Sequence, residues 1–369
     1  MENQSEGSKL NIALIGCGRI SNNHIKSILL HKDDLQLVAI CDNDKNNLEK
    51  AQSLIKELEA DSHSEKSLPN VFLNYEEFLS EVSNKSIKID LVVIATPSGF
   101  HAKQVIQAAK AGLNICTEKP MATNLADALK MVEICEKNKV NLFVVKQNRC
   151  NKTLQLVKKQ IDAGRFGDLV MLTVNVFWQR PQSYYDLADW RGTKKLDGGA
   201  LMNQASHYVD LLEWFGGPVK YVSASTATMS RKIESEDTAT LQLTWENGAL
   251  GTMAVTMLTY PENLEGSITI LGKKGTVKIG GKAVNKIEKW SFEDKSIDDE
   301  KIDEVSYETT SVYGFGHPAF YEDMISSLKG EKESICSGKE GLKSIQILEA
   351  AYLSAENGLR IELPLNQKI

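Results

Sequence analysis

The sequence predicts an α/β protein of two domains: a parallel sheet covered by helices on both faces, then an α/β domain with a large, mostly antiparallel open sheet. Three observations predict this fold class. The chain has 369 residues, which is too long for one hydrophobic core. Its first half alternates short apolar runs with segments of helical spacing, which is typical of a parallel sheet. Its second half has long strand-like runs separated by turns.

We predict a domain over residues 10–148 and a second over 149–369, after a disordered lead-in at 1–9. The first domain's expected strands are residues 10–15, 35–40, 89–94, 113–116 and 140–145. Helical spacing predicts helices at 24–30, 101–111 and 121–139, and a helix with a solvated loop within 50–70. Apolar strands alternating with helices imply a doubly wound parallel sheet.

The second domain's expected strands are residues 169–178, 221–229, 238–245, 249–259, 267–271 and 276–279. Turns at 246–248 and 272–275 favour antiparallel pairing. The acidic stretch 291–308 is expected to be a solvated hairpin or loop. Residues 342–358 predict a last helix that packs back on the first domain. An open sheet face is a route to a homodimer or homotetramer.

Composition excludes several classes of protein. Hydrophobic residues make up 42% and charged residues 25%, as in ordinary globular domains. A net charge of -6 gives no support for a nucleic-acid partner, and no apolar run is long enough to cross a membrane. The N-terminus has no signal-peptide core, and the six cysteines are scattered, without metal-ligand spacing. We expect a cytoplasmic, reduced, metal-free protein.

A glycine-rich loop directly follows the first strand. Gly16 allows a tight turn, Gly18 lets the backbone approach a pyrophosphate, and Ser21 stands at the third glycine position of the dinucleotide fingerprint. A strand-to-helix turn alone would explain the two glycines. However, Asp42 ends the second strand, where a carboxylate binds ribose hydroxyls and repels a 2′-phosphate. The pattern predicts an NAD site.

Lys119 follows another strand of the same sheet, in Glu118-Lys119-Pro120. Most lysines are solvated surface charges. Ligands of such sheets, however, bind at the carboxyl ends of strands, so this lysine should lie where cofactor and substrate meet. The residues expected to contact the cofactor are Gly16, Gly18, Arg19, Ile20, Asp42, Thr96, Pro97, Ser98, His101, Glu118, Lys119 and Gln147.

A second motif lies after a Gly-Gly pair in the second half. If residues 200–214 form one helix, Asn203, Ser206, His207 and Asp210 share a face. A lone histidine on a helix is more often structural than catalytic, but a whole polar face favours a site. His207 is therefore a candidate proton acceptor or ligand of a substrate hydroxyl.

The loop Gly16-Cys17-Gly18-Arg19-Ile20, the Glu118-Lys119-Pro120 motif and the His207 helix together resemble the glucose-fructose oxidoreductase/inositol dehydrogenase (Gfo/Idh/MocA) family. The resemblance spans nearly the whole chain. It implies an N-terminal Rossmann domain, a C-terminal α/β domain, and hydride exchange between NAD(P) and a sugar or polyol. It makes Lys119 and His207 catalytic. Many members have aspartate where this chain has Asn203, and an amide cannot serve as a base.

Further strings, including those around Arg149, Trp190 and Tyr260, look like the branch of that family that oxidises UDP-N-acetylglucosaminuronic acid at carbon 3, for sugars of bacterial surface polysaccharides such as lipopolysaccharide O-antigen. A uronate and a diphosphate need cations, and aromatic rings stack on sugar or uracil. These aromatic residues could equally belong to the core or to an oligomer contact. The expected substrate contacts are Lys119, Arg149, Arg180, Tyr184, Trp190, Arg191, Asn203, Ser206 and His207.

Two alternatives remain open at this point. The chain could be another dehydrogenase of the family, acting on inositol or a free sugar, or a nucleotide-sugar ketoreductase. It could also be a non-catalytic NAD-binding regulator.

Overall fold

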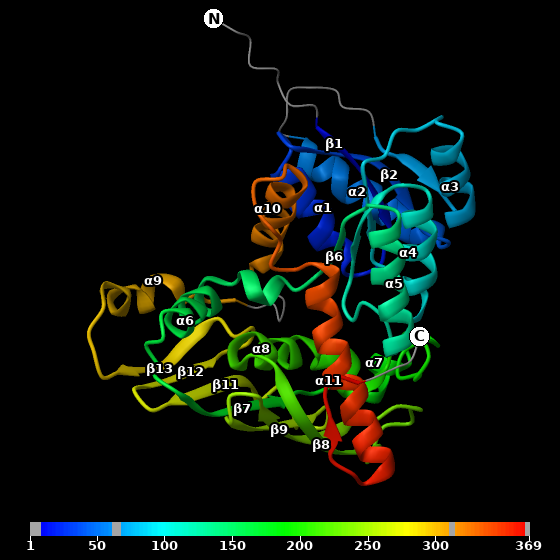
Figure 1. Cartoon of the computed structure of the whole chain (residues 1–369). Helices are drawn as coiled ribbons and strands as arrows, with labels where there is room; N and C mark the ends of the chain where they lie inside the picture. Colours follow the sequence, from blue (N-terminus) through cyan, green and yellow to red (C-terminus); the bar gives the residue numbers. More distant parts are fainter. Residues whose placement is uncertain (1–8, 61–67, 310–313, 366–369) are drawn as a thin grey trace, which may run out of the picture. The chain divides into compact units, whose positions relative to one another are not determined.

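The structure is a computed structural model that describes residues 9–60, 68–309 and 314–365 (Figure 1). Most of the predicted lead-in, and part of the loop predicted after the helix within 50–70, lie outside these residues. Contacts between Cα atoms divide the chain into two units. The first is Met1–Ala122, Asp127–Val145 and His317–Gly341; the second is Thr123–Ala126, Lys146–Gly316 and Leu342–Ile369. The predicted domain boundaries and the docking of the last helix on the first domain stay predictions.

The first unit is built on a six-stranded sheet in the order β3-β2-β1-β4-β5-β6, in which every pair is parallel. Its strands are β1 (Leu10–Ile15), β2 (Leu35–Cys41), β3 (Asn70–Phe72), β4 (Leu91–Ile94), β5 (Asn114–Thr117) and β6 (Leu142–Val144). All four residues of β4 are buried, as expected for a strand covered on both faces. The chain reverses its direction of winding at β1, which has β2 on one side and β4 on the other.

Helices connect these strands, as the sequence predicts. They are α1 (Ser21–Leu30), α2 (Lys45–Glu59), α3 (Tyr75–Ser83), α4 (His101–Lys110) and α5 (Leu125–Lys137). A further helix of this unit, α10 (Gly316–Leu328), comes from later in the chain, after β13. Helices α3 and α10 are additions to the prediction. Helix α5 begins at Leu125, four residues later than the expected start, because Pro120 and a turn follow β5 first.

The second unit is built on an eight-stranded sheet in the order β13-β12-β11-β7-β10-β9-β8-β14. Its strands are β7 (Leu169–Phe177), β8 (Val219–Ala227), β9 (Thr238–Trp245), β10 (Leu250–Thr256), β11 (Glu265–Gly272), β12 (Gly275–Gly280), β13 (Lys286–Phe292) and β14 (Ile361–Glu362). Only β7 and β10 pair in parallel among these strands. This confirms the predicted fold class.

Helices cover one face of this sheet, and α8 lies along β7 (Figure 1). The helical elements of the second unit are η2 (Gln147–Cys150), α6 (Lys152–Asp162), α7 (Gln182–Tyr185), η3 (Ala200–Gln204), α8 (Ser206–Gly216), η4 (Ile297–Lys301), α9 (Ile302–Val305) and α11 (Gly338–Asn357). Along β9, inward residues such as Leu241 are buried and the alternate residues are exposed or half-buried.

The expectation of a solvated hairpin or loop at residues 291–308 needs a correction, although every residue of this stretch except Asp298 is exposed or half-buried. Strand β13 runs into this stretch, and η4 and α9 follow it. Asp298 is buried, and its carboxylate accepts hydrogen bonds from Lys159 and Gln160 of α6. Arg165 donates to both oxygens of Asp299 at 2.6 and 2.8 Å. Cations from the segment before β7 therefore hold the acidic stretch, which the local sequence could not reveal.

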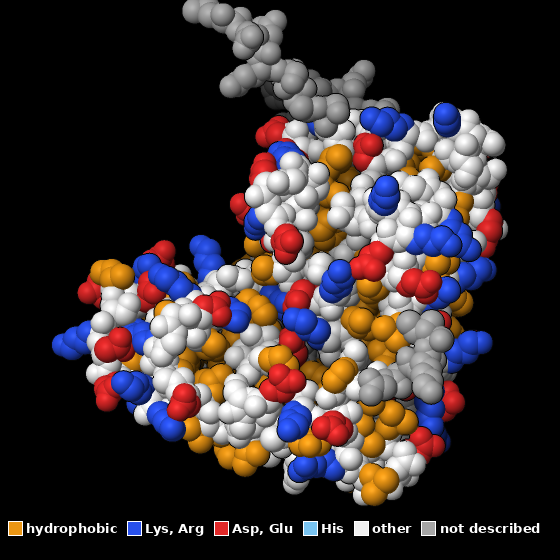
Figure 2. All heavy atoms as spheres, in the orientation of Figure 1, with side chains coloured by type: hydrophobic (Ala, Val, Ile, Leu, Met, Phe, Trp, Pro, Cys, Tyr) orange, Lys and Arg blue, Asp and Glu red, His pale blue; other side chains and the backbone are white. Residues whose placement is uncertain are grey.

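None of the described helices is both long and apolar enough to cross a membrane. Figure 2 shows basic and acidic side chains interspersed over the face in view.

Candidate active site

The glycine loop lies at the point where the first sheet reverses its winding. Gly16 follows β1 with φ +94°, and a Cβ there would lie 2.6 Å from the carbonyl oxygen of Ala95, which follows β4. A Cβ on Gly18 would meet nothing within 4 Å. The first glycine is thus required by the protein's own packing, whereas the second leaves open space next to the backbone. Space of this kind is what a pyrophosphate at the start of α1 requires.

Asp42 joins the glycine loop to the end of β2. Its Oδ2 accepts a hydrogen bond from Cys17 N at 2.7 Å, and its Oδ1 accepts one from Asp44 N at 2.8 Å. Both contacts fix the carboxylate beside the loop, which fits the predicted ribose contact. The residues present therefore fit NAD, with the loop from Gly16 to Ser21 for its pyrophosphate and Asp42 for its ribose.

The segment after β4 is tied to the segment after β5. His101 is 1% exposed, and its Nε2 and Nδ1 lie 2.8 and 2.9 Å from the carbonyl oxygens of Thr96 and Pro120. Thr96 Oγ1 donates to Gln104 at 2.6 Å. His101 thus supports two loops that the sequence places at the cofactor, and its predicted direct contact with NAD stays a prediction.

In the second unit, a buried ion-pair cluster follows β6. Asp210 of α8 is 3% exposed and accepts hydrogen bonds from Lys146 and, at 2.8 Å each, from Nε and Nη2 of Arg149. Ser344 of α11 donates to the same carboxylate at 2.9 Å. Burial acts to raise the pKa of Asp210, but the two cations outweigh it and hold the pKa well below its usual range. Arg149 is therefore paired with Asp210 within the protein. The contact between Arg149 and the substrate stays a prediction.

The expected single helix over residues 200–214 is interrupted, which corrects the prediction of a shared polar face. Residues Ala200–Gln204 form one π-helical turn, and α8 begins only at Ser206. Asn203 donates its amide to the buried Asp197. Asp210 faces the ion-pair cluster. The register that would align Asn203 with Asp210 on a regular helix is therefore lost.

His207 is half-buried at the start of α8, and its Nε2 lies 3.1 Å from Nε2 of Gln147. Gln147 is 2% exposed. The structure thus places this residue, predicted from sequence to contact NAD, against the candidate catalytic histidine. Ser206 is buried and donates to the carbonyl oxygen of Asn203 at 3.0 Å.

Two predicted substrate residues, Arg180 and Arg191, come together around the ring of a third, Tyr184. Arg180 and Arg191 place their Cζ atoms 5.5 and 4.5 Å from the ring centroid of Tyr184. Arg191 Nη1 also donates to the Tyr184 hydroxyl at 2.7 Å, and its Cζ lies 4.6 Å from the Trp190 ring. Arg191 has no carboxylate within ion-pair distance in the part of the chain that the structure describes. Two guanidinium groups held against the same ring can bind an anionic group of a ligand, such as a carboxylate or a phosphate.

Two supporting carboxylates were missed by the sequence analysis. Asp197 is fully buried and accepts from Gly192 N at 2.7 Å as well as from Asn203. Glu236 accepts from Leu201 N at 2.8 Å and so holds the π-helical turn. Asp197 stands before the Gly-Gly pair and could have been suspected. Glu236 lies in a different segment, before β9, and carries no local signal.

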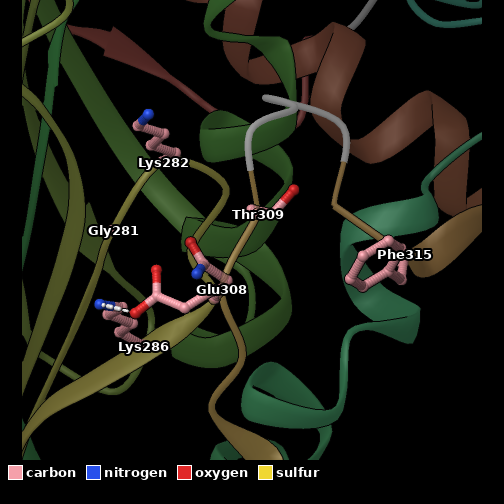
Figure 3. Close-up of a pocket in the computed structure, with 7 residues that line it drawn as sticks. Gly281, Lys282, Lys286, Glu308, Thr309 and Phe315 are labelled. Carbon is pink, nitrogen blue, oxygen red and sulfur yellow. Dashed lines mark ion pairs between the residues drawn. The ribbon is translucent and has the colours of Figure 1, made fainter.

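A separate pocket of about 570 Å³ lies beside β13 and is lined by Gly281, Lys282, Asn285, Lys286, Glu308, Thr309 and Phe315. Figure 3 shows Lys286 paired with Glu308, at 2.6 Å, and Phe315 on the opposite wall. None of the predicted site residues lines it. No group of three or more potential metal ligands occurs among the described residues.

The predicted site residues fall into two sets. Those from Gly16 to Lys119 lie in the first unit, and those from Gln147 to His207 lie in the second. The pairing of Lys119 with His207 therefore stays a prediction.

The glycine loop lies where the first sheet reverses its winding, and the carboxylate of Asp42 lies beside it. Together they are typical of a dinucleotide-binding protein of the α/β class. The oxidoreductase family's NAD-binding Rossmann fold matches residues 10–146, and that family's C-terminal alpha/beta domain matches residues 158–363. The chain therefore belongs to the Gfo/Idh/MocA oxidoreductase family, which confirms the predicted family, enzyme class and cofactor NAD.

Among solved structures, the chain is similar to the WlbA dehydrogenase of Bordetella pertussis in complex with NADH and UDP-GlcNAcA. The two are 52% identical with a TM-score of 0.90, over 98% of this chain and 99% of that one. The WlbA dehydrogenase of Chromobacterium violaceum, in complex with the same two molecules, is 48% identical with a TM-score of 0.88, over 97% of each chain. D-apiose dehydrogenase of Paraburkholderia graminis is 26% identical over 95% of this chain and 89% of its own length.

Proposed function

We propose that this chain is an NAD-dependent dehydrogenase that oxidises the 3-hydroxyl of UDP-N-acetyl-D-glucosaminuronic acid to the 3-keto sugar. The observation that carries the proposal is the 52% identity, over 98% of the chain, with a dehydrogenase solved with NADH and UDP-GlcNAcA. The local geometry of each unit supports it, because one offers a dinucleotide loop and the other a histidine and a pair of arginines.

Oxidation of the hydroxyl removes a hydride from carbon 3 and a proton from the oxygen. NAD, when bound, supplies the acceptor for the hydride. The protein must then hold the hydroxyl and accept its proton. We assign these roles to Lys119, which is half-buried after β5, and to His207. Asn203 is an amide and cannot accept the proton, so its contribution is a hydrogen bond to the sugar.

Gln147 orients His207 in this scheme. Its amide meets Nε2 of the imidazole at 3.1 Å, and its burial prevents it from swinging away. A histidine fixed in this way keeps one ring orientation, so that the sugar hydroxyl meets the same nitrogen in each turnover.

The substrate carries a uronate and a diphosphate. Arg180 and Arg191, which both lie over the Tyr184 ring, are the cations we assign to these groups. Trp190 and Tyr184 supply flat surfaces for the sugar or the uracil. A dehydrogenase of an unphosphorylated polyol would have no need for two guanidinium groups placed in this way.

A dehydrogenase of a free sugar is the second candidate, and the similarity to D-apiose dehydrogenase over 95% of the chain favours it. The two candidates separate in a thermal-shift series with NAD present, using UDP-GlcNAcA, free N-acetylglucosamine, D-apiose and myo-inositol. A matching ligand stabilises the folded protein by mass action. We expect UDP-GlcNAcA to be the one ligand of the four that raises Tm and leads to the formation of NADH. A rise with D-apiose and none with the nucleotide sugar would overturn the proposal.

We also propose that the enzyme is a cytoplasmic homodimer or homotetramer that serves the synthesis of surface-polysaccharide sugars such as those of O-antigen. The face of the second sheet that carries Leu250 and Thr252 supports an oligomer. Leu250 is 52% exposed, and residues along β10 alternate between buried and exposed or half-buried. Light scattering on the purified protein and on Thr252→Arg tests it. A monomeric native protein would contradict this part.

A further inference from the structure

A buried polar cluster lies in the first unit, beside the lysine to which we assign catalysis. His24, Glu118, His317 and Tyr321 are 0, 6, 3 and 0% exposed. They come from separate segments: His24 from α1, which follows the glycine loop, Glu118 from the end of β5, and the other two from α10. The fold thus brings three segments to one buried carboxylate.

Both oxygens of that carboxylate have partners. Glu118 Oε1 accepts a hydrogen bond from His24 Nε2 at 3.1 Å, and Glu118 Oε2 accepts one from the backbone N of Lys119 at 3.0 Å. The other nitrogen of His24, Nδ1, lies 2.9 Å from the hydroxyl of Tyr321. The chain of contacts therefore runs from α10 through α1 to the backbone of Lys119.

The carboxylate is charged in this setting. Burial acts to raise the pKa of Glu118, but the hydrogen bond from His24 and the nearby His24, His317 and Lys119 outweigh it and bring the pKa to about 2. A buried charge is expensive unless its partners compensate it, and an apolar or neutral side chain would fill the same space at lower cost. The structure thus holds a negative charge in direct contact with the backbone of Lys119.

We propose that His24 and Glu118 are positioning residues that fix the backbone at Lys119 and connect the helix of the cofactor loop to the catalytic lysine. The inference rests on the proposed function, because it needs Lys119 to handle the proton. The hydrogen bond to Lys119 N sets the orientation of its peptide unit. That orientation decides where a long, flexible side chain begins, and so where its ammonium group can reach.

The alternative is that the cluster only stabilises the core. The two roles predict different kinetics. A stabilising cluster lowers Tm when it is damaged and leaves the folded enzyme's turnover unchanged. A positioning cluster lowers kcat far more than it changes KM for the sugar or the affinity for NAD. Both oxygens of Glu118 meet His24 and Lys119 N, and most of the residues assigned to bind the two ligands lie outside the cluster.

The test compares Glu118→Gln with Tyr75→Phe. The glutamine keeps the shape but presents an NH2 group to one of two donors. The phenylalanine removes a different buried hydrogen bond of the same unit, from the Tyr75 hydroxyl to the carbonyl oxygen of Gln104 at 2.8 Å. We expect both to lower Tm. Only Glu118→Gln should lower kcat, by roughly 20-fold or more, with KM and the NAD dissociation constant within threefold of the native values. A Glu118→Gln enzyme with native kcat would overturn the inference.

A second readout does not depend on turnover. Reductive methylation with carbon-13 gives each lysine an NMR signal, and the signal missing from Lys119→Met identifies Lys119. We expect this signal to move in Glu118→Gln and to stay unchanged in Tyr75→Phe. If Glu118→Gln does not fold, His24→Gln takes its place with the same expected outcomes. An unmoved signal would contradict the inference.

Failure of this inference differs from failure of the proposed function. If Lys119→Met keeps native turnover, the catalytic assignment itself is wrong. If Lys119→Met is inactive while Glu118→Gln turns over at the native rate, only the positioning role is wrong.

Discussion

Two glycines of the same loop should respond differently to replacement by alanine. Gly16→Ala should destabilise the fold, whereas Gly18→Ala should weaken NAD binding. Gly16 has φ +94°, and a Cβ there would lie 2.6 Å from Ala95 O and 2.9 Å from Thr96 N. These are backbone atoms of the segment that directly follows β4, so they cannot move aside as a flexible side chain could. Gly18 has no atom within 4 Å of the same position and no left-handed φ.

The expected magnitudes follow from these distances. A left-handed backbone costs a non-glycine residue about 1–2 kcal/mol, and overpacking adds a similar amount. Gly16→Ala should therefore lose about 3 kcal/mol, or roughly 6–12 °C in Tm at 2–4 °C per kcal/mol. Gly18→Ala should leave the Tm without NAD unchanged or slightly raised, because alanine narrows the unfolded ensemble.

NAD binding should be weakened in Gly18→Ala, the variant whose stability without NAD is not lowered. The methyl group of Gly18→Ala occupies the space through which the backbone approaches the pyrophosphate. We expect at least a tenfold rise in Kd for NAD, or about 1.4 kcal/mol. With NAD at 100 times the native Kd, the native protein gains about 2.7 kcal/mol and the variant about 1.4 kcal/mol. The NAD-induced rise in Tm should then fall by half.

Thermal unfolding with and without NAD, with calorimetric titration, measures both effects. A Gly18→Ala protein with the native NAD-induced rise in Tm would show that the pyrophosphate does not lie on this loop. A Gly16→Ala protein with native Tm would refute the argument from the Ala95 contact.

Three further predictions concern single carboxylates. Asp42→Asn keeps an acceptor for Cys17 N but removes the charge, so the ratio of NADP to NAD affinity in titrations should rise about tenfold or more; an unchanged ratio would contradict the ribose contact. Asp210→Asn leaves two buried cations poorly compensated, and unfolding in urea should show a loss of about 3 kcal/mol; a loss below about 1 kcal/mol would mean that the ion-pair cluster is not stabilising. Burial raises the pKa of Glu236 from 4.5 to about 7. Between these two pH values the folded protein keeps a proton on Glu236 that the unfolded chain releases. The free energy of unfolding should therefore fall as pH rises from 4.5 through 7, by about 3 kcal/mol in total. Glu236→Gln should remove most of that fall, and an equally steep fall in the variant would assign it to another group.

The parts of the fold that follow from local rules were predictable. Gly16 and Asp42 lie at strand ends, where chain geometry and charge act within a few residues, and both are where the sequence places them. The alternation of strands and helices predicts the parallel sheet for the same reason. The sequence predicts that His207 lies on a helix, which is confirmed, but it does not predict that this helix begins only at Ser206.

The parts that depend on distant partners were not predictable. The acidic stretch was expected to be solvated because nothing near it shows that Arg165 and Lys159 meet it. The π-helical turn depends on Glu236, which holds Leu201 N from another segment. Asp210 was expected on a site face, but Lys146 and Arg149, far earlier in the chain, hold it in the core.

The most direct test of the central claim is the steady-state rate of NADH formation from UDP-GlcNAcA by the native enzyme and by Lys119→Met, each with its NAD dissociation constant. We expect the native enzyme to form NADH and a 3-keto sugar, and Lys119→Met to bind NAD within about threefold of the native affinity while turnover falls by about 100-fold or more. A native enzyme that forms no NADH from this sugar, or a Lys119→Met enzyme with near-native turnover, would contradict the account.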